Sequence, residues 1–301
     1  MSERFDNPLL SMAGLARHAS LNRNSTRDAG LSSITMTDIY KHPEEYDLEH
    51  LGEEEDIAFY VSLVRTLRPL RILELGCGTG RITLPLAQEG ARLGCDVIGL
   101  DNQPEMLESA EQHRTAMSPE IRERLRFIAG DMRTFSAEPK LDLIVIPCSS
   151  MSHVIELDDQ IAVFKRCYEN LNPGGRFMVE VNMPNMAAYA DSFSTPPRTP
   201  IEIDLDRSDE SDGTRLIRRK TTRYLSDQQL AHIRFLYEKY QHGRAIESHI
   251  DDFASHVFFP RELALLFIHS GFEIERTLGD YRGRPLAANS PLIIMTGKRP
   301  G

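Results

Sequence analysis

The sequence predicts a doubly wound α/β sheet domain into which an antiparallel β meander is inserted. Two observations predict this fold. Short β-rich runs alternate with helix-like stretches from residue 71 to residue 181, as in parallel sheets whose strands are connected by helices. After residue 190 the alternation stops, and β-like runs follow one another without an intervening helix.

The first half of the chain supplies the elements of the α/β core. Apolar residues at helical spacing from Asp56 onward predict a helix that ends before Pro69. Short runs, several of them apolar on both faces, predict parallel strands at 71–75, 96–100, 124–129, 141–146 and 175–181. Helix-like stretches lie between these strands at 81–90, 104–113 and 158–171.

The second half of the chain has a different sequence pattern. A proline-rich connection at 194–200 leads into three or four runs of alternating polar and apolar residues, which predict an antiparallel sheet with one solvated face. A helix follows at 260–271, and two more strands close the chain. We divide the chain into a mobile N-terminal arm, an α/β core, an antiparallel insertion and a C-terminal segment that completes the core: 1–35, 36–189, 190–258 and 259–301.

Composition excludes several classes of function. The net charge of −10 argues against a nucleic-acid substrate, because binding to the phosphate backbone needs clustered Lys and Arg. The four cysteines form no CxxC pair and the ten histidines show no HxxxH or HExxH spacing, so no metal site is expected. No apolar run approaches the ~20 residues of a membrane span, and the start does not resemble a signal peptide. We expect a cytoplasmic protein with no membrane partner.

The segment RILELGCGTGR (71–81) places Gly76, Gly78 and Gly80 directly after a strand. A glycine-rich turn between a strand and a helix brings backbone N–H groups close to a ligand at the positive end of the helix. The dinucleotide fingerprint GxGxxG would need a glycine where the chain has Arg81, and no GK[ST] sequence marks a Walker loop. The alternative is a tight turn that binds nothing.

Acidic residues follow two later strands. VIGLD ends the second strand at Asp101, and AGDM places Asp131 after the third. The carboxyl ends of parallel strands meet at the crevice where open α/β sheets bind ligands, and an acid at the end of the second strand is placed to bind ribose hydroxyls. Each acid alone is more often a helix N-cap or a loop residue than a ligand-binding residue. Together with NPGG (172–175) before the fifth strand, they favour a nucleotide-like ligand.

The ordered motifs ELGCGTG, GLD, GDM, LDLIVIP and NPGG resemble those of class I S-adenosylmethionine-dependent methyltransferases of the small-molecule type. The resemblance covers about residues 38–299, including the insertion. It implies a seven-stranded Rossmann-like sheet with a final antiparallel strand. It also implies S-adenosyl-L-methionine as cofactor, S-adenosyl-L-homocysteine as its product and a small molecule as methyl acceptor.

The same resemblance assigns the cofactor residues. The glycines would line the methionine part, with Glu74 supporting the loop, and Asp101 would take the ribose hydroxyls. Asp131 and the Met132 backbone N–H would meet the adenine. The complete implied set is Tyr46, Glu74, Gly76, Cys77, Gly78, Gly80, Asp101, Asn102, Met106, Asp131, Met132, Pro147 and Cys148.

The segment IPCSSMSHV (146–154) follows the fourth strand at the mouth of the predicted pocket. His153 is the candidate base or substrate anchor, although it could simply pack against the helix that follows. Cys148 is disfavoured as a nucleophile because no base stands beside it in the sequence. Candidate substrate contacts are Tyr40, Ser149, Tyr224 and Tyr281.

We therefore expect methyl transfer to a nitrogen or oxygen atom of a small molecule by direct in-line displacement, which needs no metal. One alternative is a catalytically silent protein that binds S-adenosylmethionine or S-adenosylhomocysteine as a regulator. A nicotinamide-dependent oxidoreductase is disfavoured by Arg81. The antiparallel insertion could also join two chains as a homodimer, because open sheet edges pair readily.

Overall fold

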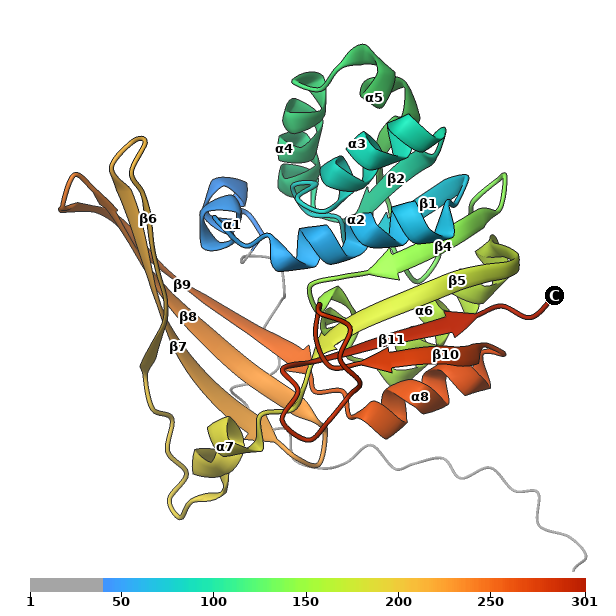
Figure 1. Ribbon diagram of the computed structural model, residues 1–301. Coiled ribbons are helices and arrows are strands. Elements are labelled where there is room, and N and C mark those ends of the chain that lie inside the picture. The colour runs from blue at the N-terminus through green and yellow to red at the C-terminus, as the bar shows by residue number, and fades with distance from the viewer. Residues whose placement is uncertain (1–39) are drawn as a thin grey trace, which may run out of the picture. The chain divides into compact units, whose positions relative to one another are not determined.

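The computed structural model describes residues 40–301, and the predicted arm at 1–35 lies outside them (Figure 1). A seven-stranded sheet has the order β10-β11-β5-β4-β1-β2-β3. Neighbours among β1 to β5 pair in parallel, whereas β11 pairs antiparallel with both β5 and β10. The strands are β1 (Arg71–Leu75), β2 (Asp96–Asp101), β3 (Leu125–Ala129), β4 (Leu141–Ile146), β5 (Leu171–Asn182), β10 (Glu273–Leu278) and β11 (Leu292–Lys298). The predicted α/β fold with a final antiparallel strand is confirmed.

Helices cover both faces of this sheet, which is why its central strands are apolar on both sides. On β4, Leu143 and Val145 pack on the face covered by α2 (Glu55–Leu67) and α3 (Thr83–Leu93). Ile144 and Ile146 pack on the other face, under α6 (Leu157–Asn170) and α8 (Pro260–His269). The remaining helices of the core are α4 (Pro104–Thr115) and α5 (Pro119–Arg124). Within 40–301, no helix is both long and apolar enough to cross a membrane.

A separate four-stranded sheet contains β6 (Glu202–Asp209), β7 (Thr214–Leu225), β8 (Leu230–Gln241) and β9 (Arg244–His256), in that order and antiparallel throughout. His242 and Gly243 form the two-residue turn between β8 and β9, and both have positive φ, as the favoured hairpin turns require. The chain reaches this sheet through α7 (Met186–Tyr189) and the 3-10 helix η2 (Ala190–Phe193).

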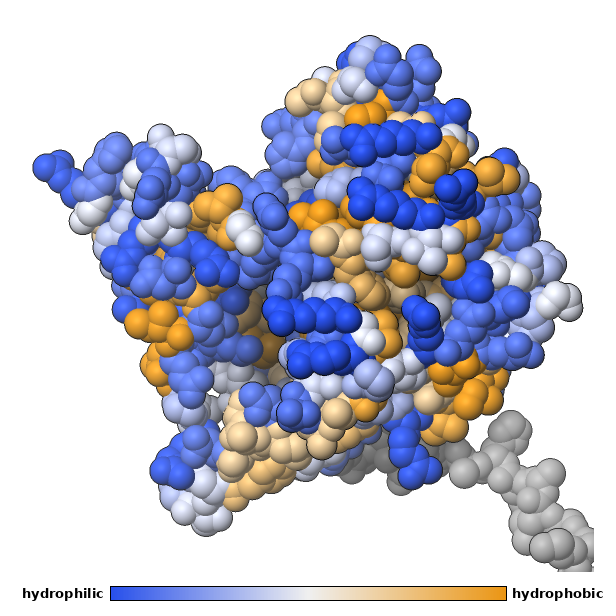
Figure 2. Space-filling model, in the orientation of Figure 1, coloured by the Kyte–Doolittle hydropathy of each residue, from blue (hydrophilic) through white to orange (hydrophobic). Residues whose placement is uncertain are grey.

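The antiparallel sheet stands beside the carboxyl ends of the parallel strands, and the short helix α1 (Pro43–Glu49) lies between it and the core (Figure 1). Its surface mixes hydrophilic residues with isolated apolar ones (Figure 2). Exposed isoleucines on its strands include Ile203, Ile246 and Ile250. The antiparallel sheet is inserted between β5 and β10 of the seven-stranded sheet.

Local sequence patterns missed some elements and boundaries. The short helices α1, α5, α7 and η2 were not predicted, because seven or fewer residues carry little periodicity. NPGG was predicted as a turn before the fifth strand but forms part of β5. Gly174 N donates to Arg299 O at 2.8 Å and Arg299 N donates to Gly175 O at 2.8 Å, so pairing with the end of the chain extends this strand.

The glycine-rich loop gives a test of the fold. Gly80 has a φ of +84°, and a Cβ there would lie 2.8 Å from Phe127 Cζ. We expect Gly80→Ala to lower the free energy of unfolding by about 2–4 kcal/mol, from the left-handed backbone and the collision together. Gly174, at φ +82° with open space around it, is the control, and Gly174→Ala should cost only about 1–2 kcal/mol. Equal losses in chemical denaturation would contradict the close contact with Phe127.

Candidate functional site

A cavity of about 590 Å³ lies between the carboxyl ends of the parallel strands and the antiparallel sheet. On the core side it is lined by the loops after β1, β2, β3 and β4. On the other side it is lined by side chains of β7, β8 and β9. Twelve of the predicted site residues line it: Tyr40, Tyr46, Gly76, Gly78, Asp101, Asn102, Met106, Asp131, Met132, Cys148, Ser149 and His153.

The glycine loop is held against the end of β2 by its own backbone. Gly76 N and Cys77 N both donate to Leu100 O, at 2.8 and 3.1 Å. Gly78 N donates to Asp101 Oδ2 at 2.8 Å, and Gln103 N donates to Asp101 Oδ1 at 2.9 Å. Burial raises the pKa of the Asp101 carboxyl, and these backbone donors oppose that shift. Asp101 therefore shapes the loop as well as facing the cavity.

Close approach explains the first glycine of the motif. Gly76 has a φ of +75°, and a Cβ at this position would lie 2.8 Å from Ser150 Cβ. Ser150 begins the 3-10 helix η1 (Ser150–His153) after β4. The loops after β1 and β4 can meet there only because residue 76 has no side chain.

Behind the loop lie two ionisable residues that do not line the cavity. Glu74 is buried, Thr83 Oγ1 donates to its Oε2 at 2.5 Å, and burial raises its pKa to about 8. Arg81 forms an ion pair with Asp56 of α2, and its NH2 group lies 3.2 Å from Cys148 Sγ. Arg81, which stands where the dinucleotide fingerprint has its third glycine, therefore connects α2 to the loop after β4.

The acid after β3 is paired in this structure. Arg133 NH2 lies 2.6 Å from Asp131 Oδ2, and Arg133 NH1 lies 2.7 Å from Asp159 Oδ2. The hydrogen bond from Arg133 lowers the pKa of Asp131, so this carboxylate stays charged. Asp131 faces the same cavity as Asp101, as predicted from the positions of the two strands.

The loop after β4 has an unusual backbone. Cys148 and Ser149 are consecutive non-glycine residues with φ of 53° and 58°. Asn182 N donates to Ser149 Oγ at 2.9 Å, which ties the loop to the end of β5. Left-handed backbone at such residues is concentrated at functional sites. Burial raises the pKa of the Cys148 thiol far above neutrality, which argues against a thiolate nucleophile.

Tyr40 and His153 form a hydrogen-bonded pair in the cavity wall, with Tyr40 OH 2.6 Å from His153 Nε2. Burial lowers the pKa of His153 to about 4, and it raises the pKa of Tyr40. Both groups are therefore neutral at pH 7, and we assign the tyrosine hydroxyl as the donor and Nδ1 as the protonated imidazole nitrogen. His153 Nδ1 has no hydrogen-bond partner within residues 40–301.

The antiparallel sheet contributes an aromatic and basic wall that sequence reasoning missed. Arg218 lies over the Phe235 ring, 4.1 Å from its centroid, and is paired with Glu49 at 2.6 Å. Tyr237 OH also donates to Glu49, at 2.7 Å. The residues of this wall are Arg218, Lys220, Ile233, Phe235, Tyr237, Phe253 and Ser255.

The helix α1 joins the two sides of the cavity. Thr79 Oγ1, in the glycine loop, donates to Asp47 Oδ1 at 2.6 Å, and Glu49 accepts from Arg218 and Tyr237. Tyr46 lies over the loop, with ring atoms 3.8–4.0 Å from where a Cβ of Gly78 would be. Only Tyr46 was predicted to lie at this site, and that prediction came from the family resemblance. The contacts of Asp47 and Glu49 join residues that no sequence motif connects.

Six predicted site residues do not line the cavity: Glu74, Cys77, Gly80, Pro147, Tyr224 and Tyr281. The first four lie in or beneath the loops that shape it. Tyr224 instead stacks on Tyr189, with ring centroids 4.5 Å apart, at the far end of β7. Tyr281 OH donates to the buried Glu180 at 2.7 Å. The structure therefore gives both tyrosines a packing contact where the sequence predicted a substrate contact.

Comparison with known proteins agrees with this geometry. Residues 72–175 match the family model described as a methyltransferase domain. A putative methyltransferase of Bacillus subtilis, YqeM, is 34% identical over 113 residues. That alignment covers 37% of this chain and 42% of YqeM, so the chain matches less than half the length of this relative.

Solved structures share the fold over a longer stretch. The CcbJ methyltransferase of Streptomyces caelestis superposes with a TM-score of 0.66 at 20% identity, covering 82% of this chain and 97% of CcbJ. DesVI of Streptomyces venezuelae superposes with a TM-score of 0.65 at 21% identity, covering 86% and 98%. The predicted resemblance to methyltransferases is confirmed for residues 72–175, which match a methyltransferase domain. Over the longer stretch, the superpositions show that the chain shares the fold of CcbJ and DesVI.

The Tyr40–His153 pair gives a test by NMR titration. An ordinary imidazole takes up a proton near pH 6.5, whereas His153 should do so only near pH 4. Because the unfolded chain binds this proton at the higher pH, stability from neutral His153 should be lost as the pH falls from about 6.5 to 4. We expect the His153 ring signals, identified by their absence in His153→Asn, to stay constant from pH 8 to 5.5. A midpoint near 6.5 would show that the ring is not held in its neutral form.

Proposed function

We propose that this chain is an S-adenosylmethionine-dependent methyltransferase that transfers a methyl group to a nitrogen or oxygen atom of a small molecule. The observation that carries the proposal is the composition of one cavity. A glycine loop and two acids from successive parallel strands line one side, and aromatic and basic side chains from a second sheet line the other. Such a cavity can hold a nucleotide-like donor and an acceptor next to each other.

The core side fits the proposed cofactor. Gly78 presents its backbone beneath Tyr46, and Asp101 and Asp131 face the cavity from the ends of neighbouring strands. Each oxygen of Asp101 accepts one backbone N–H and keeps a further lone pair for a hydroxyl donor. Both oxygens of Asp131 accept from Arg133, so the adenine amino group would replace one of those contacts. We propose Asp101 for the ribose hydroxyls and Asp131 for the adenine, with Asn102, Met106 and Met132 beside them.

S-adenosylmethionine supplies a methyl group on a positively charged sulfur, so the leaving group is activated before the enzyme acts. The chain then has to bind the acceptor, aim its nucleophilic atom and exclude water. Positioning of this kind can lower a barrier by about 7–11 kcal/mol in favourable intramolecular models. Phe235 and Phe253 supply flat apolar surfaces for this purpose on the acceptor side.

Tyr40 and His153 lie where the two sides meet, because His153 packs against Phe253 with ring centroids 5.9 Å apart. A His153 pKa of about 4 makes the ring a weak base, so we propose that it chiefly holds Tyr40 and orients the acceptor. Removal of the acceptor's proton can then pass through the Tyr40 hydroxyl, which donates its own proton to Nε2. Ser149 remains a candidate polar contact beside this pair.

Lys220 indicates the charge of the acceptor. Two other basic groups that line the cavity are paired: Arg133 with Asp131 and Asp159, and Arg218 with Glu49 and Asp204. The Lys220 ammonium lies within hydrogen-bond or ion-pair distance of no side chain between residues 40 and 301. Its burial lowers its pKa, and the charges of Asp204 and Glu202 oppose that shift only in part. A partly buried ammonium group without a partner is costly unless a ligand supplies an anion. We therefore propose an acceptor with a carboxylate or phosphate group.

The two alternatives have weaker support. A nicotinamide dinucleotide would need close backbone approach at position 81, where Arg81 is committed to Asp56 and Cys148. A catalytically silent regulator would bind the cofactor but has no need for an aromatic and basic wall beside it. Turnover of labelled S-adenosylmethionine separates the silent regulator from the enzyme.

Cofactor binding is tested by changing Asp101. We expect Asp101→Asn to weaken binding of S-adenosylhomocysteine at least tenfold in isothermal titration calorimetry, because an NH2 donor replaces one carboxylate oxygen and the remaining oxygen loses its charge. Asp142→Asn is the matched control. Asp142 also accepts from two backbone amides, Leu70 N at 2.9 Å and Arg71 N at 3.0 Å, but it does not line the cavity. An equal loss of affinity in both variants would place the ribose elsewhere.

The anionic acceptor is tested with paired substrates. Small amines and alcohols that carry a carboxylate are compared with their carboxamides for transfer of a labelled methyl group. We expect the carboxylate of a pair to react at least tenfold faster by kcat/KM and Lys220→Met to remove most of that preference. Arg219→Met is the control. Arg219 directly precedes Lys220 on β7, but it does not line the cavity and it pairs with Glu238. Equal rates for the two members of each pair would refute an anionic acceptor.

A further inference from the structure

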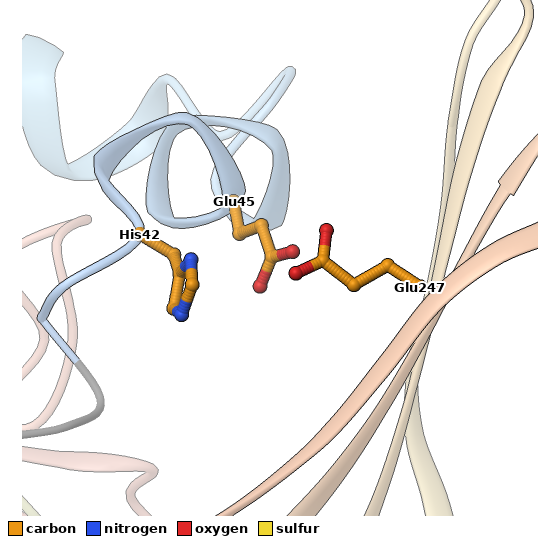
Figure 3. Close-up of side chains that lie close together, drawn as sticks. All are labelled: His42, Glu45 and Glu247. Atoms are coloured by element: carbon orange, nitrogen blue, oxygen red, sulfur yellow. The ribbon is translucent and has the colours of Figure 1, made fainter.

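Outside the cavity, three metal-ligating side chains converge where α1 meets β9. His42 immediately precedes α1, Glu45 lies in its first turn, and Glu247 projects from β9 (Figure 3). The two carboxylates face each other, and the His42 ring stands beside Glu45 (Figure 3). Each residue offers one ligand atom, and these atoms all lie within 4.8 Å of one another.

Glu45 is the residue that makes this cluster unusual. It is 3% exposed, and its Oε1 atom accepts no hydrogen bond from the described part of the chain. Lys239 Nζ lies 3.9 Å from Oε1, and His249 Nε2 lies 3.4 Å from Oε2 without forming a hydrogen bond. The buried Glu45 carboxylate therefore faces the Glu247 carboxylate. The nearby Lys239 and His249 side chains form no hydrogen bond with Glu45.

Such an arrangement is unfavourable in the absence of a cation or a proton. Two carboxylates at this distance repel, and burial of one of them increases the cost. Because Glu45 Oε1 is buried and accepts no hydrogen bond from residues 40–301, a cation held between the two carboxylates would supply the partner that this atom lacks. One imidazole nitrogen and two carboxylate oxygens are a donor set suited to borderline divalent cations, and zinc can be held by three such protein ligands with water in the fourth position, as it is in catalytic sites.

We propose that His42, Glu45 and Glu247 bind one divalent transition-metal cation of the Zn²⁺ type, with solvent completing its coordination. The site is separate from the cavity, since none of the three residues lines it. Its role is structural: the cation joins α1 to the antiparallel sheet. Because α1 also carries Tyr46 and Glu49, which do line the cavity, the cation holds that helix in its place over the glycine loop.

The position of these ligands explains why histidine spacing in the sequence did not predict the site. His42 and Glu45 are three residues apart across a helix start, and Glu247 comes from a strand some two hundred residues later. Within residues 40–301 no other group of three such side chains comes this close together.

The test uses the full chain after treatment with a chelator, with ZnCl₂ as the probe in a competition titration against a chromophoric chelator. We expect one equivalent of Zn²⁺ to bind and to raise the thermal unfolding midpoint. Glu247→Gln should lower the affinity at least tenfold, and His42→Gln should do the same. Glu44→Gln is the matched control, because Glu44 is an exposed acid on the same helix that lies outside the cluster.

Several outcomes would overturn the proposal. One is a finding that the wild-type protein binds Zn²⁺ no more tightly than the Glu247→Gln variant does. Another is a Glu44→Gln variant that loses as much affinity as Glu247→Gln, since that would indicate general attraction to negative charge. Because Glu247 is exposed, its substitution should leave the fold intact, and circular dichroism of the chelator-treated variant checks this. S-adenosylhomocysteine binding, measured separately, distinguishes failure of this proposal from failure of the proposed function.

Discussion

The carboxylate of Glu49 is the contact on which the geometry of the cavity depends. It accepts from Arg218 at 2.6 Å and from Tyr237 at 2.7 Å, so one side chain of α1 holds two strands of the antiparallel sheet. Three residues earlier in the sequence, Tyr46 covers the glycine loop, and Asp47 accepts from Thr79 of that loop. A helix of seven residues thus sets the distance between the two sides of the site. The ion pair between Glu49 and Arg218 is partly buried, and both side chains form further hydrogen bonds, which makes it stronger than an exposed pair.

The two sides of the cavity are built by different physical means. On the core side, backbone hydrogen bonds define the shape: Leu100 O receives two amides of the glycine loop, and Asp101 receives a third. On the opposite side, the wall consists of side chains on one face of a twisted sheet, where alternate residues such as Arg218 and Lys220 point the same way. Substitutions of wall residues other than Arg218 and Tyr237, which hold Glu49, can therefore change the proposed acceptor side without disturbing the proposed cofactor side, whereas the glycine loop tolerates almost none.

This difference also determines what the sequence could predict. The order of the core strands and the positions of Gly76, Asp101 and Asp131 follow from short motifs, because each motif and its structural role lie within a few residues. Tyr224 shows where that reasoning stops. It lies on β7 four residues beyond Lys220, on the same face of the strand but about 13 Å further along, outside the cavity. Alternation identifies a face, but it does not tell which part of the strand meets another sheet.

The Tyr40–His153 pair shows a second limit of sequence reasoning. A histidine after the fourth strand was a sound candidate for a base, and the structure does place it in the cavity wall. Its chemistry, however, depends on a tyrosine 113 positions away and on how completely the assembled sheets exclude water from the ring. Burial lowers the pKa of His153, so the packing that would position the proposed acceptor also weakens the nearest base. In the methyl transfer that we propose, the leaving group is already activated, so a weak base costs little, because alignment contributes more to the rate than proton removal does.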